Sequence, residues 1–359
     1  MAAVEILQVI PELDPGGAEL ILLSLCRLLP RERFRVAVAA LDGRGALAER
    51  LRTLGCEVED LGVRSAWSPG AGRRLREVIA RRRPALVHSH LFRAHLALAA
   101  AARHVPGLVT VATEHQADPR GWALWLLRRA TRRASAITAV SDGVRRHLIA
   151  HGFPADRVRT VANGINLEVI DAAAPAARRE LGLPDGARVA VFVGRLTQQK
   201  GLDILLSAMR RLVAVRPELH LLVAGRGEPA RLTDPRLADR VHFLGWRGNV
   251  PAILKAADLV VLPSRWEGLS LVLLEAMAAR RAVVATQVEG QGEVLEDGAS
   301  GLLVPPEDPA ALGAAIERVL SDAALGRHLG EAARRTVEQS YTDRKMAARY
   351  ATLYDELLM

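Results

Sequence analysis

Short apolar runs alternate with amphipathic helical segments along this chain of 359 residues, and that alternation restricts its fold more than any other feature. Apolar runs between turn residues are typical of strands buried in parallel sheets, and the helical segments supply the crossovers. The strands expected in the first half are Ile6–Ile10, Arg35–Ala40, Cys56–Leu61, Ala85–His88, Leu108–Thr113, Ala136–Val140 and Arg159–Val161. Those expected in the second half are Val189–Val193, Leu219–Ala224, Val241–Leu244, Asp258–Pro263 and Ala282–Thr286. The sequence therefore predicts an α/β protein built of βα units.

The two sets of strands are separated by an alanine-rich segment, residues 168–184, which lacks strand character. A boundary near residue 170 divides the chain into domains of 1–170 and 171–340, each long enough for its own core. The last segment, 341–359, is expected to form one amphipathic helix. Its apolar face comprises Met346, Tyr350, Leu353, Tyr354 and Leu357. Two open α/β domains usually bind ligand at the carboxyl ends of their strands, so the segments that follow strands are the candidate sites.

The net charge of +9 lies entirely in the first half of the chain. Residues 1–170 hold 25 arginines against 16 acidic residues, and residues 171–359 hold 24 basic and 24 acidic residues. This asymmetry indicates an anionic partner for the first half. Compositional bias is an alternative, since the chain has only three lysines, but such a bias does not explain the difference between the halves.

Neither the N-terminus nor the cysteines indicate export or membrane insertion. No apolar run approaches the roughly 18 residues that cross a bilayer. The first ten residues carry an acid and no basic group, so they are expected to form a strand and not a signal peptide. Cys26 and Cys56 form no metal-binding motif, and two thiols in a chain of this size favour a reducing, cytoplasmic compartment.

The segment 263–275 carries the strongest ligand signal. It follows an expected strand, Ser270 can cap a helix over Leu271–Ala279, and Gly268 is expected to turn the chain sharply. The backbone N–H groups of Gly268, Leu269, Ser270 and Leu271 would then favour a phosphate. The carboxylates of Glu267 and Glu275 flank that position, as a ligand with hydroxyls at both ends, such as a nucleotide sugar, would require. A plain helix cap with one solvated glutamate is the alternative.

A second candidate lies after the first strand of the second domain. Arg195 leaves that strand, and Lys200 stands before the next helix, expected from near Leu202. Two cations in one loop could neutralise a diphosphate. A solvated loop with two charges is the alternative. Lys200 stands out because this chain so rarely uses lysine.

The first domain offers weaker signals. Gly16 and Gly17 precede a helix expected over Leu20–Leu29 and would let the backbone approach an anion, although such a pair often only forms a turn. His88 and His90 follow one strand and are expected to be structural. His115 closes another strand and is the better candidate for a site. No set of three ligands with metal-binding spacing appears.

Trp122, Trp125 and Arg129 lie at positions i, i+3 and i+7 beside a leucine face. This combination suits an anionic membrane surface, although an ordinary amphipathic helix buried on its leucine side has the same pattern. No nucleic-acid-binding module is evident, so no nucleic-acid partner is expected.

These motifs together resemble the GT-B glycosyltransferases of glycosyltransferase family 4, the glycosyl transferases group 1. The resemblance runs essentially end to end. It is carried by Gly16-Gly17-Ala18-Glu19, Thr113-Glu114-His115, Ala139-Val140-Ser141, Asn163-Gly164-Ile165, Gly194-Arg195-Leu196 with Lys200-Gly201, Ala224-Gly225-Arg226-Gly227, Phe243-Leu244-Gly245, Ser264-Arg265-Trp266-Glu267-Gly268 and Gly301-Leu302-Leu303-Val304-Pro305. Glu267 and Glu275 match the E-x7-E signature of that family.

The resemblance implies two Rossmann-like domains facing each other across a cleft, with the acceptor bound by the first and the nucleotide sugar by the second. It also implies that the terminal helix, 341–359, packs back on the first domain. It implies that Glu275 binds the ribose, that Glu267 holds hydroxyls of the donor sugar, and that His115 lies near that sugar. Arg195 and Lys200 would offset the charge of the diphosphate, with Gly17 lending a backbone N–H. Together with the helix terminus these groups would make a metal or other cofactor unnecessary.

The activity implied is a retaining transfer from a UDP- or GDP-linked sugar to a glycan, lipid or small-molecule acceptor, in the cytoplasm or peripherally on the cytoplasmic membrane face. The expected catalytic residues are His115, Arg195, Lys200 and Glu267. The expected donor-binding residues are Gly16, Gly17, Arg195, Lys200, Glu267, Gly268, Leu269, Ser270, Leu271 and Glu275. A sugar-nucleotide epimerase or hydrolase of the same fold is one alternative, and a non-catalytic protein that binds membrane surfaces or polyanions is another.

Overall fold

The computed structural model describes the whole chain except residues 1–2, 65–69, 118–119, 230–231 and 233. The chain forms two compact units. The first comprises Met1–Gly164 and Asp343–Met359, and the second comprises Ile165–Thr342. The sequence placed its boundaries at residues 170 and 340; residue 170 lies inside helix α7 (Leu167–Ala172), which belongs to the second unit.

The first unit is built on a parallel sheet with the strand order β3-β2-β1-β4-β5-β6-β7 within the described residues. Its strands are β1 (Val4–Ile10), β2 (Phe34–Ala40), β3 (Glu57–Asp60), β4 (Leu86–His90), β5 (Val109–Glu114), β6 (Ala136–Ala139) and β7 (Val158–Thr160). Each coincides with an expected strand to within about two residues. Strand β1 is the first in sequence but lies inside the sheet between β2 and β4, so the strand order reverses between β1 and β4.

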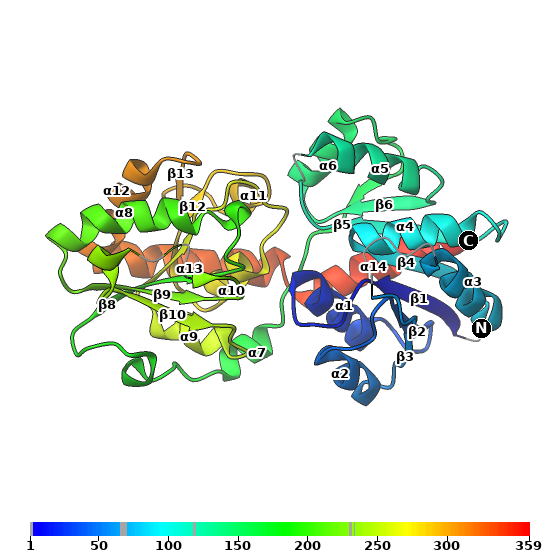
Figure 1. The fold of residues 1–359 in the computed structure, drawn as a ribbon, viewed down its shortest axis with the longest axis horizontal. Helices are drawn as coiled ribbons and strands as arrows, with labels where there is room; N and C mark the ends of the chain where they lie inside the picture. The colour runs from blue at the N-terminus through cyan, green and yellow to red at the C-terminus, as the bar shows by residue number, and fades with distance from the viewer. Residues whose placement is uncertain (1–2, 65–69, 118–119, 230–231, 233) are drawn as a thin grey trace. The chain divides into compact units, whose positions relative to one another are not determined.

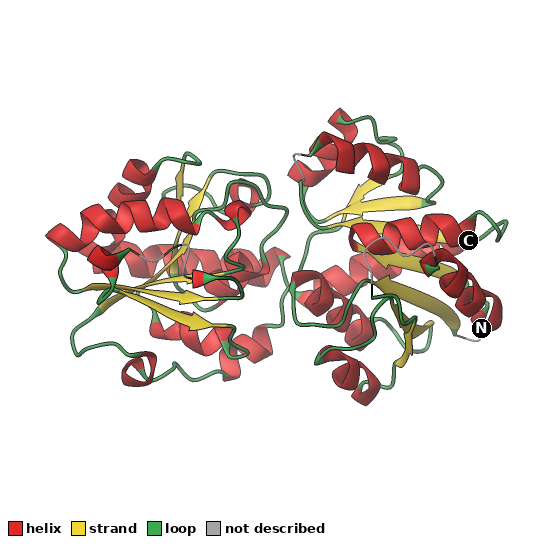
Figure 2. Cartoon of the chain, in the orientation of Figure 1, coloured by secondary structure: helices red, strands yellow, loops and turns green. Residues whose placement is uncertain are grey.

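Helices cover both faces of this sheet (Figures 1 and 2). They are α1 (Gly17–Leu28), α2 (Leu47–Thr53), α3 (Ala71–Arg82), α4 (Leu91–Ala102), α5 (Gly121–Thr131), α6 (Asp142–Ala150) and α14 (Asp343–Leu358). Because side chains alternate along a strand, Leu7 and Val9 of β1 pack toward α3 and α4, whereas Ile10 packs toward α1 and α2. The last helix, α14, packs against α1 in this unit.

The second unit is built on a parallel sheet with the order β10-β9-β8-β11-β12-β13 in the described part of the chain. Its strands are β8 (Arg188–Val193), β9 (Leu219–Ala224), β10 (Val241–Gly245), β11 (Leu259–Leu262), β12 (Ala282–Thr286) and β13 (Leu302–Val304). Strand β13 was not among the expected strands. It has only three residues and lies at the sheet edge beside β12, so its apolar run is too short to be distinguished from a loop.

The helical elements of the second unit are α7, η1 (Arg178–Leu181), η2 (Gln198–Lys200), α8 (Leu202–Val215), η4 (Pro235–Leu237), α9 (Val250–Ala256), α10 (Leu271–Ala278), α11 (Gln291–Val294), α12 (Pro309–Ser321) and α13 (Ala323–Ser340). Helices α8 and α12 pack together over one face of the sheet, where Phe192, Leu205 and Ile316 are buried in one apolar core. The two expected parallel sheets of an α/β protein are therefore confirmed.

One expected helix begins elsewhere than predicted. The sequence placed Gly17 in a loop before a helix at Leu20, but α1 begins at Gly17, with Gly16 as its extended N-cap residue. Glu19 then lies in the first turn, where its carboxylate complements the positive end of the helix dipole. The prediction failed because glycine is a weak helix former, and this favourable placement of an acid outweighs that weakness.

Candidate active site

The candidate site of the second unit lies at the carboxyl ends of β8 and β11. These strands are neighbours in the sheet, although α8, β9, β10 and α9 lie between them in sequence. The strand order reverses between them, and ligands of open α/β sheets bind at such a switch point. The loop after β8 carries Arg195 and Lys200, and the loop after β11 carries Glu267. The topology thus brings together the two segments that the sequence singled out.

Close backbone contact holds the two loops against each other. Gly201 follows Lys200 at a φ of +65°, and a Cβ at this position would collide with the carbonyl oxygen of Pro263. Only glycine combines this conformation with so close an approach. The N–H of Arg265 also donates to the carbonyl of Gln199 at 2.8 Å.

The side chain of Arg265 strengthens the same junction. Its guanidinium donates to both carboxylate oxygens of Asp203 at 2.9 and 2.7 Å, and to the carbonyl of Gln198 at 2.8 Å. The Arg265 guanidinium lowers the pKa of the Asp203 carboxyl from its usual value. Asp203 lies in the first turn of α8, and Gln198 lies in the η2 turn. Arg265 therefore holds both the start of α8 and the η2 turn against the loop after β11.

Lys200 and Glu267 meet at this junction as a mostly buried ion pair. The Lys200 ammonium contacts Oε1 of Glu267, and the hydroxyl of Ser264 donates to the same oxygen at 3.1 Å. The side chains are 19% and 8% exposed. Both bonds end on Oε1, and the described residues include no partner for Oε2. The pair therefore retains one carboxylate oxygen and part of an ammonium group that can bind a ligand.

Arg195 differs from Lys200 in its environment. It lies in the same loop but is exposed, and no hydrogen-bond or ion-pair partner for its guanidinium is found among the described residues. Its charge is thus not already neutralised by a neighbouring carboxylate.

Helix α10 begins where the sequence predicted. Ser270 is its N-cap, and the serine hydroxyl accepts a hydrogen bond from the N–H of Leu273 at 3.4 Å. This leaves the N–H groups of Leu271 and Val272 in the first turn for another acceptor. Gly268 does not adopt a positive φ. Instead Gly290, at a φ of +74° after β12, lets the chain pass so close that a Cβ there would collide with the carbonyl of Gly268.

Glu275 lies in the second turn of α10, between buried Leu274 and Ala276. Burial raises the pKa of its carboxyl to about 7. No hydrogen bond to this carboxyl is found in the described residues, so its ionised form lacks donors that would compensate for lost solvation. A ligand with hydroxyl donors would supply them.

In the first unit, the segments after β1 and β5 carry the remaining predicted residues. Gly16 and Gly17 form the N-terminus of α1, where the Glu19 carboxylate lies against Gly16 and already occupies part of the space expected for an anion. His115 follows β5 and is half-buried. Burial and the neighbouring His95 ring lower its pKa to about 3, so His115 is a neutral ring at physiological pH.

His88 and His90, which the sequence assigned to structural roles, are fully buried on β4. Burial lowers the pKa of both rings well below the usual value. His90 Nδ1 lies 3.3 Å from His115 Nε2, so His90 is within hydrogen-bond distance of the candidate residue.

Comparison with known proteins identifies the family of this chain. The model described as Glycosyl transferases group 1 matches residues 187–322, and that described as Glycosyltransferase Family 4 matches residues 15–169. The alpha-D-kanosaminyltransferase of Streptomyces kanamyceticus is 33% identical over 69% of this chain and 67% of that protein. The alpha-maltose-1-phosphate synthase of Mycolicibacterium smegmatis is 32% identical over 75% and 78%. This chain belongs to glycosyltransferase family 4.

The fold of this family 4 glycosyltransferase also has relatives of known structure. Anabaena Alr3699/HepE in complex with UDP-glucose superposes with a TM-score of 0.86 at 23% identity, over 98% of this chain and 100% of that chain. The two Rossmann-like units are therefore those of the GT-B fold.

The family 4 site contains positioning residues that sequence reasoning did not assign. Ser264 and Arg265 lie inside the segment that the sequence emphasised, but nothing in their spacing shows that one bonds Glu267 and the other holds the η2 turn. The partner of Arg265, Asp203, is about 60 residues away in sequence, and the contact of Ser264 with Glu267 depends on the conformation of the loop. Only the folded chain reveals these contacts.

Neither a metal centre nor a membrane span is found in the described part of this transferase. Its described residues include no group of three or more His, Cys, Asp or Glu side chains that could hold a metal ion. None of the helices within them is both long and apolar enough to cross a bilayer.

Proposed function

We propose that this glycosyltransferase moves a sugar from a UDP-linked donor to a hydroxyl of its acceptor with retention of anomeric configuration. The observation that carries the proposal is the Lys200–Glu267 pair at the β8–β11 switch point, with Arg195 in the same loop and Glu275 on α10. The Alr3699/HepE structure, which holds UDP-glucose, supports uridine over guanosine as the donor base. Comparison with transferases does not favour an epimerase or hydrolase.

In this proposal the second unit binds the donor. Glu275 accepts hydrogen bonds from the ribose hydroxyls, and Oε2 of Glu267 accepts them from the sugar. The first-turn N–H groups of α10, next to Gly268, Leu269 and Ser270, bind the diphosphate together with Arg195 and Lys200. These cations stabilise the charge that grows on the diphosphate as the glycosidic bond breaks, and this stabilisation is larger in the transition state than in the ground state.

The first unit is proposed to bind the acceptor and contributes His115. A neutral ring can accept a hydrogen bond from a substrate hydroxyl, but with a pKa of about 3 it is a weak base. Gly16 and Gly17 are proposed to lend backbone N–H groups to a phosphate, for which the Glu19 carboxylate must move aside.

A screen of UDP- and GDP-linked sugars by thermal unfolding tests the donor proposal. A true donor at 100 times its Kd should add about 2.7 kcal/mol to the free energy of unfolding. The bare nucleotide should also stabilise the protein. We expect Glu275→Ala to abolish stabilisation by the bare nucleotide, whereas Glu267→Ala should keep it and lose sugar transfer. If both variants bound the bare nucleotide equally, the assigned division between ribose and sugar would be wrong.

Turnover with the identified donor then tests the reaction. A transferase requires an acceptor, so consumption of donor at full rate without any acceptor would favour the hydrolase or epimerase. The anomeric configuration of the product, read by NMR, should match that of the donor, and an inverted product would contradict retention.

We also propose a cytoplasmic location and peripheral contact with an anionic membrane. Cys26 and Cys56 are free thiols, and both are buried. On α5, Trp122 and Trp125 are each 55% exposed while Leu124 and Leu127 are buried. Trp125, Arg128, Arg129, Arg132 and Arg157 line a hollow of about 410 Å³, and no acidic residue is among the described residues of its lining. Co-sedimentation with vesicles tests the membrane contact.

A further inference from the structure

A line of buried polar side chains connects the last helix, α14, to His115 through the sheet of the first unit. Its members are the fully or almost fully buried Gln8, His88, His90, Thr113, Thr138, Tyr350 and Tyr354. His88 and His90 are two residues apart on β4, so both point to the face of the sheet that α14 covers. Because so many polar side chains are buried together away from water, they must form hydrogen bonds with one another.

The first half of this line leads from His115 to α14. His115 Nε2 lies 3.3 Å from His90 Nδ1, and His90 Nε2 lies 2.8 Å from the side-chain oxygen of Gln8. The side-chain nitrogen of Gln8 donates to the hydroxyl of Tyr354 at 3.1 Å.

The second half returns from α14 to the sheet. The Tyr354 hydroxyl lies 2.6 Å from His88 Nδ1, and His88 Nε2 lies 2.6 Å from the hydroxyl of Thr113. Thr113 in turn contacts the hydroxyls of Thr138 at 2.5 Å and Tyr350 at 3.1 Å.

The Gln8 amide determines where the protons lie. Its oxygen can only accept, so His90 must carry its proton on Nε2. The neutral His90 ring then accepts at Nδ1, and His115 must donate from Nε2. Burial lowers the pKa of both rings, which keeps them neutral. His115 is left with an unprotonated Nδ1, for which the described residues provide no partner.

Turning the Gln8 amide over would reverse every bond in the line and move the His115 proton to Nδ1. The hydroxyls of Thr113, Thr138, Tyr350 and Tyr354 can rotate to follow either direction, so they do not choose between the two arrangements. The choice rests on the orientation of the Gln8 amide, whose nitrogen donates to the Tyr354 hydroxyl and whose oxygen faces His90.

We propose that Gln8, whose amide nitrogen donates to Tyr354, is a positioning residue that keeps the His115 proton on Nε2, so that Nδ1 accepts a hydrogen bond from a substrate hydroxyl. The inference rests on the proposed role of His115 in transfer. It adds that α14, through Tyr354, takes part in the hydrogen bonds that set the tautomer of a ring at the end of β5.

The protonation of the ring nitrogens in the full-length protein can be read from long-range ¹H–¹⁵N correlation spectra. We expect His115 of the unmodified chain to be neutral with its proton on Nε2. Gln8→Met keeps the shape of the side chain without its hydrogen bonds and should yield a mixture of the two tautomers. Turnover should fall about 10- to 100-fold, the range for loss of a group that orients a metal-binding histidine, with little change in the donor KM.

A matched pair of variants on α14 separates this role from simple loss of stability. Tyr354→Phe and Tyr350→Phe each remove one buried hydroxyl, but only Tyr354 contacts Gln8. We expect Tyr354→Phe to shift the His115 tautomer and Tyr350→Phe to leave it unchanged. An unchanged tautomer in both Gln8→Met and Tyr354→Phe would overturn the inference, even with His115→Ala inactive. Full turnover by His115→Ala would instead overturn the proposed role of His115, whatever the spectra show.

Discussion

At the scale of single residues, the two cations after β8 are not equivalent. Lys200 is mostly buried and bound to Glu267, whereas Arg195 is exposed and has no partner among the described residues. Both can serve a diphosphate, but only Lys200 also neutralises a buried carboxylate of the protein. Because of this difference, we expect Lys200 to contribute to both stability and turnover, and Arg195 to turnover alone.

Arg195→Ala and Lys200→Ala should therefore differ in stability but not in their effect on turnover. Each variant should lose about 2.7–4 kcal/mol of transition-state stabilisation, the range for removal of one group that binds developing charge. Lys200→Ala should in addition lower the free energy of unfolding by about 3 kcal/mol, because it leaves Glu267 buried without its counter-ion. Urea denaturation and steady-state turnover measure the two effects. Equal stability of the two variants would contradict the importance of the ion pair.

Glu275 makes the stability of the protein depend on pH. Its pKa is raised from 4.5 to about 7, so the stability that its neutral form contributes is full below pH 4.5 and is lost as the pH rises through 7. Glu275→Gln should become more stable relative to the unmodified chain as the pH increases from 5 to 8. Calorimetric Tm values over this range measure the difference. Glu289→Gln, at an exposed position, is the control, and a pH-independent difference for Glu275→Gln would refute the prediction.

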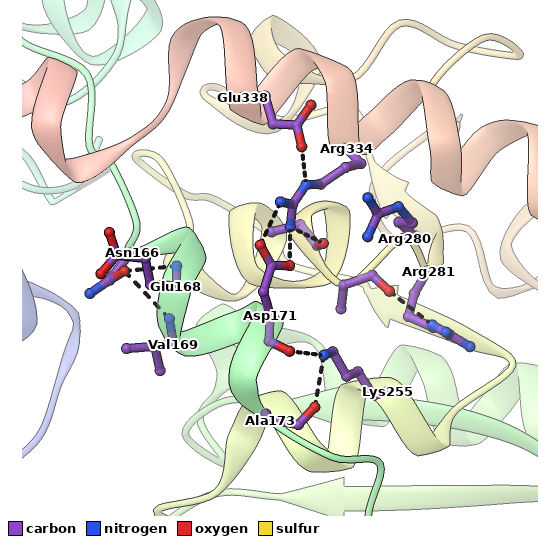
Figure 3. Close-up of polar contacts among 12 residues, drawn as sticks. Asn166, Glu168, Val169, Asp171, Ala173, Lys255, Arg280, Arg281, Arg334 and Glu338 are labelled. Atoms are coloured by element: carbon purple, nitrogen blue, oxygen red, sulfur yellow. Dashed lines mark hydrogen bonds and ion pairs between the residues drawn. The ribbon is translucent and has the colours of Figure 1, made fainter.

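At the scale of elements, α7 is held by side chains from distant parts of the second unit (Figure 3). Arg334 of α13 donates to both oxygens of Asp171 at 2.8 Å and to the carbonyl of Ala278 at 2.9 Å. Lys255 donates to the carbonyls of Asp171 and Ala173 at the end of α7. A helix of six residues is marginal by itself, so these bonds stabilise it.

Arg334→Ala should destabilise the second unit by about 1–3 kcal/mol, because it removes a buried guanidinium that donates to the half-exposed Asp171 carboxylate and to the carbonyl of Ala278. Arg334→Lys should recover little of this loss, since an ammonium cannot reproduce the planar pair of donors. Urea denaturation measures both. Glu331→Ala breaks the exposed Arg280–Glu331 pair nearby and should change stability by less than about 1 kcal/mol. A loss for Glu331→Ala as large as that for Arg334→Ala would contradict the expected dependence on burial.

At the scale of the whole molecule, the charge asymmetry of the sequence coincides with the division into units. The first unit carries the arginine excess, including the arginines around Trp122 and Trp125 on α5. Since arginine neutralises acidic headgroups and tryptophan inserts at the interface, we expect binding to anionic vesicles that decreases with salt.

Sedimentation with phosphatidylglycerol vesicles, compared with phosphatidylcholine vesicles, measures this binding. Each arginine near the surface should contribute about 1 kcal/mol, so Arg128→Ala with Arg132→Ala should weaken binding to the anionic vesicles roughly 30-fold. Trp122→Ala with Trp125→Ala should weaken it without changing the salt dependence. Equal binding to neutral and anionic vesicles would contradict the proposal.

The sequence by itself determined the class of the fold and the segments that carry the site, because strand and helix periodicity and the glycine, arginine and glutamate motifs are local patterns. It could place Glu267 before α10 and Glu275 within it because a capping serine follows a buried strand. It did not show β13, the true start of α1 or the pairing of Lys200 with Glu267.

The pairing of Lys200 with Glu267, and the line of polar groups from Tyr354 to His115, were decided by the tertiary structure alone. Their partners are distant in sequence, and a buried polar group is stable only where the folded chain supplies a donor or acceptor at the correct distance.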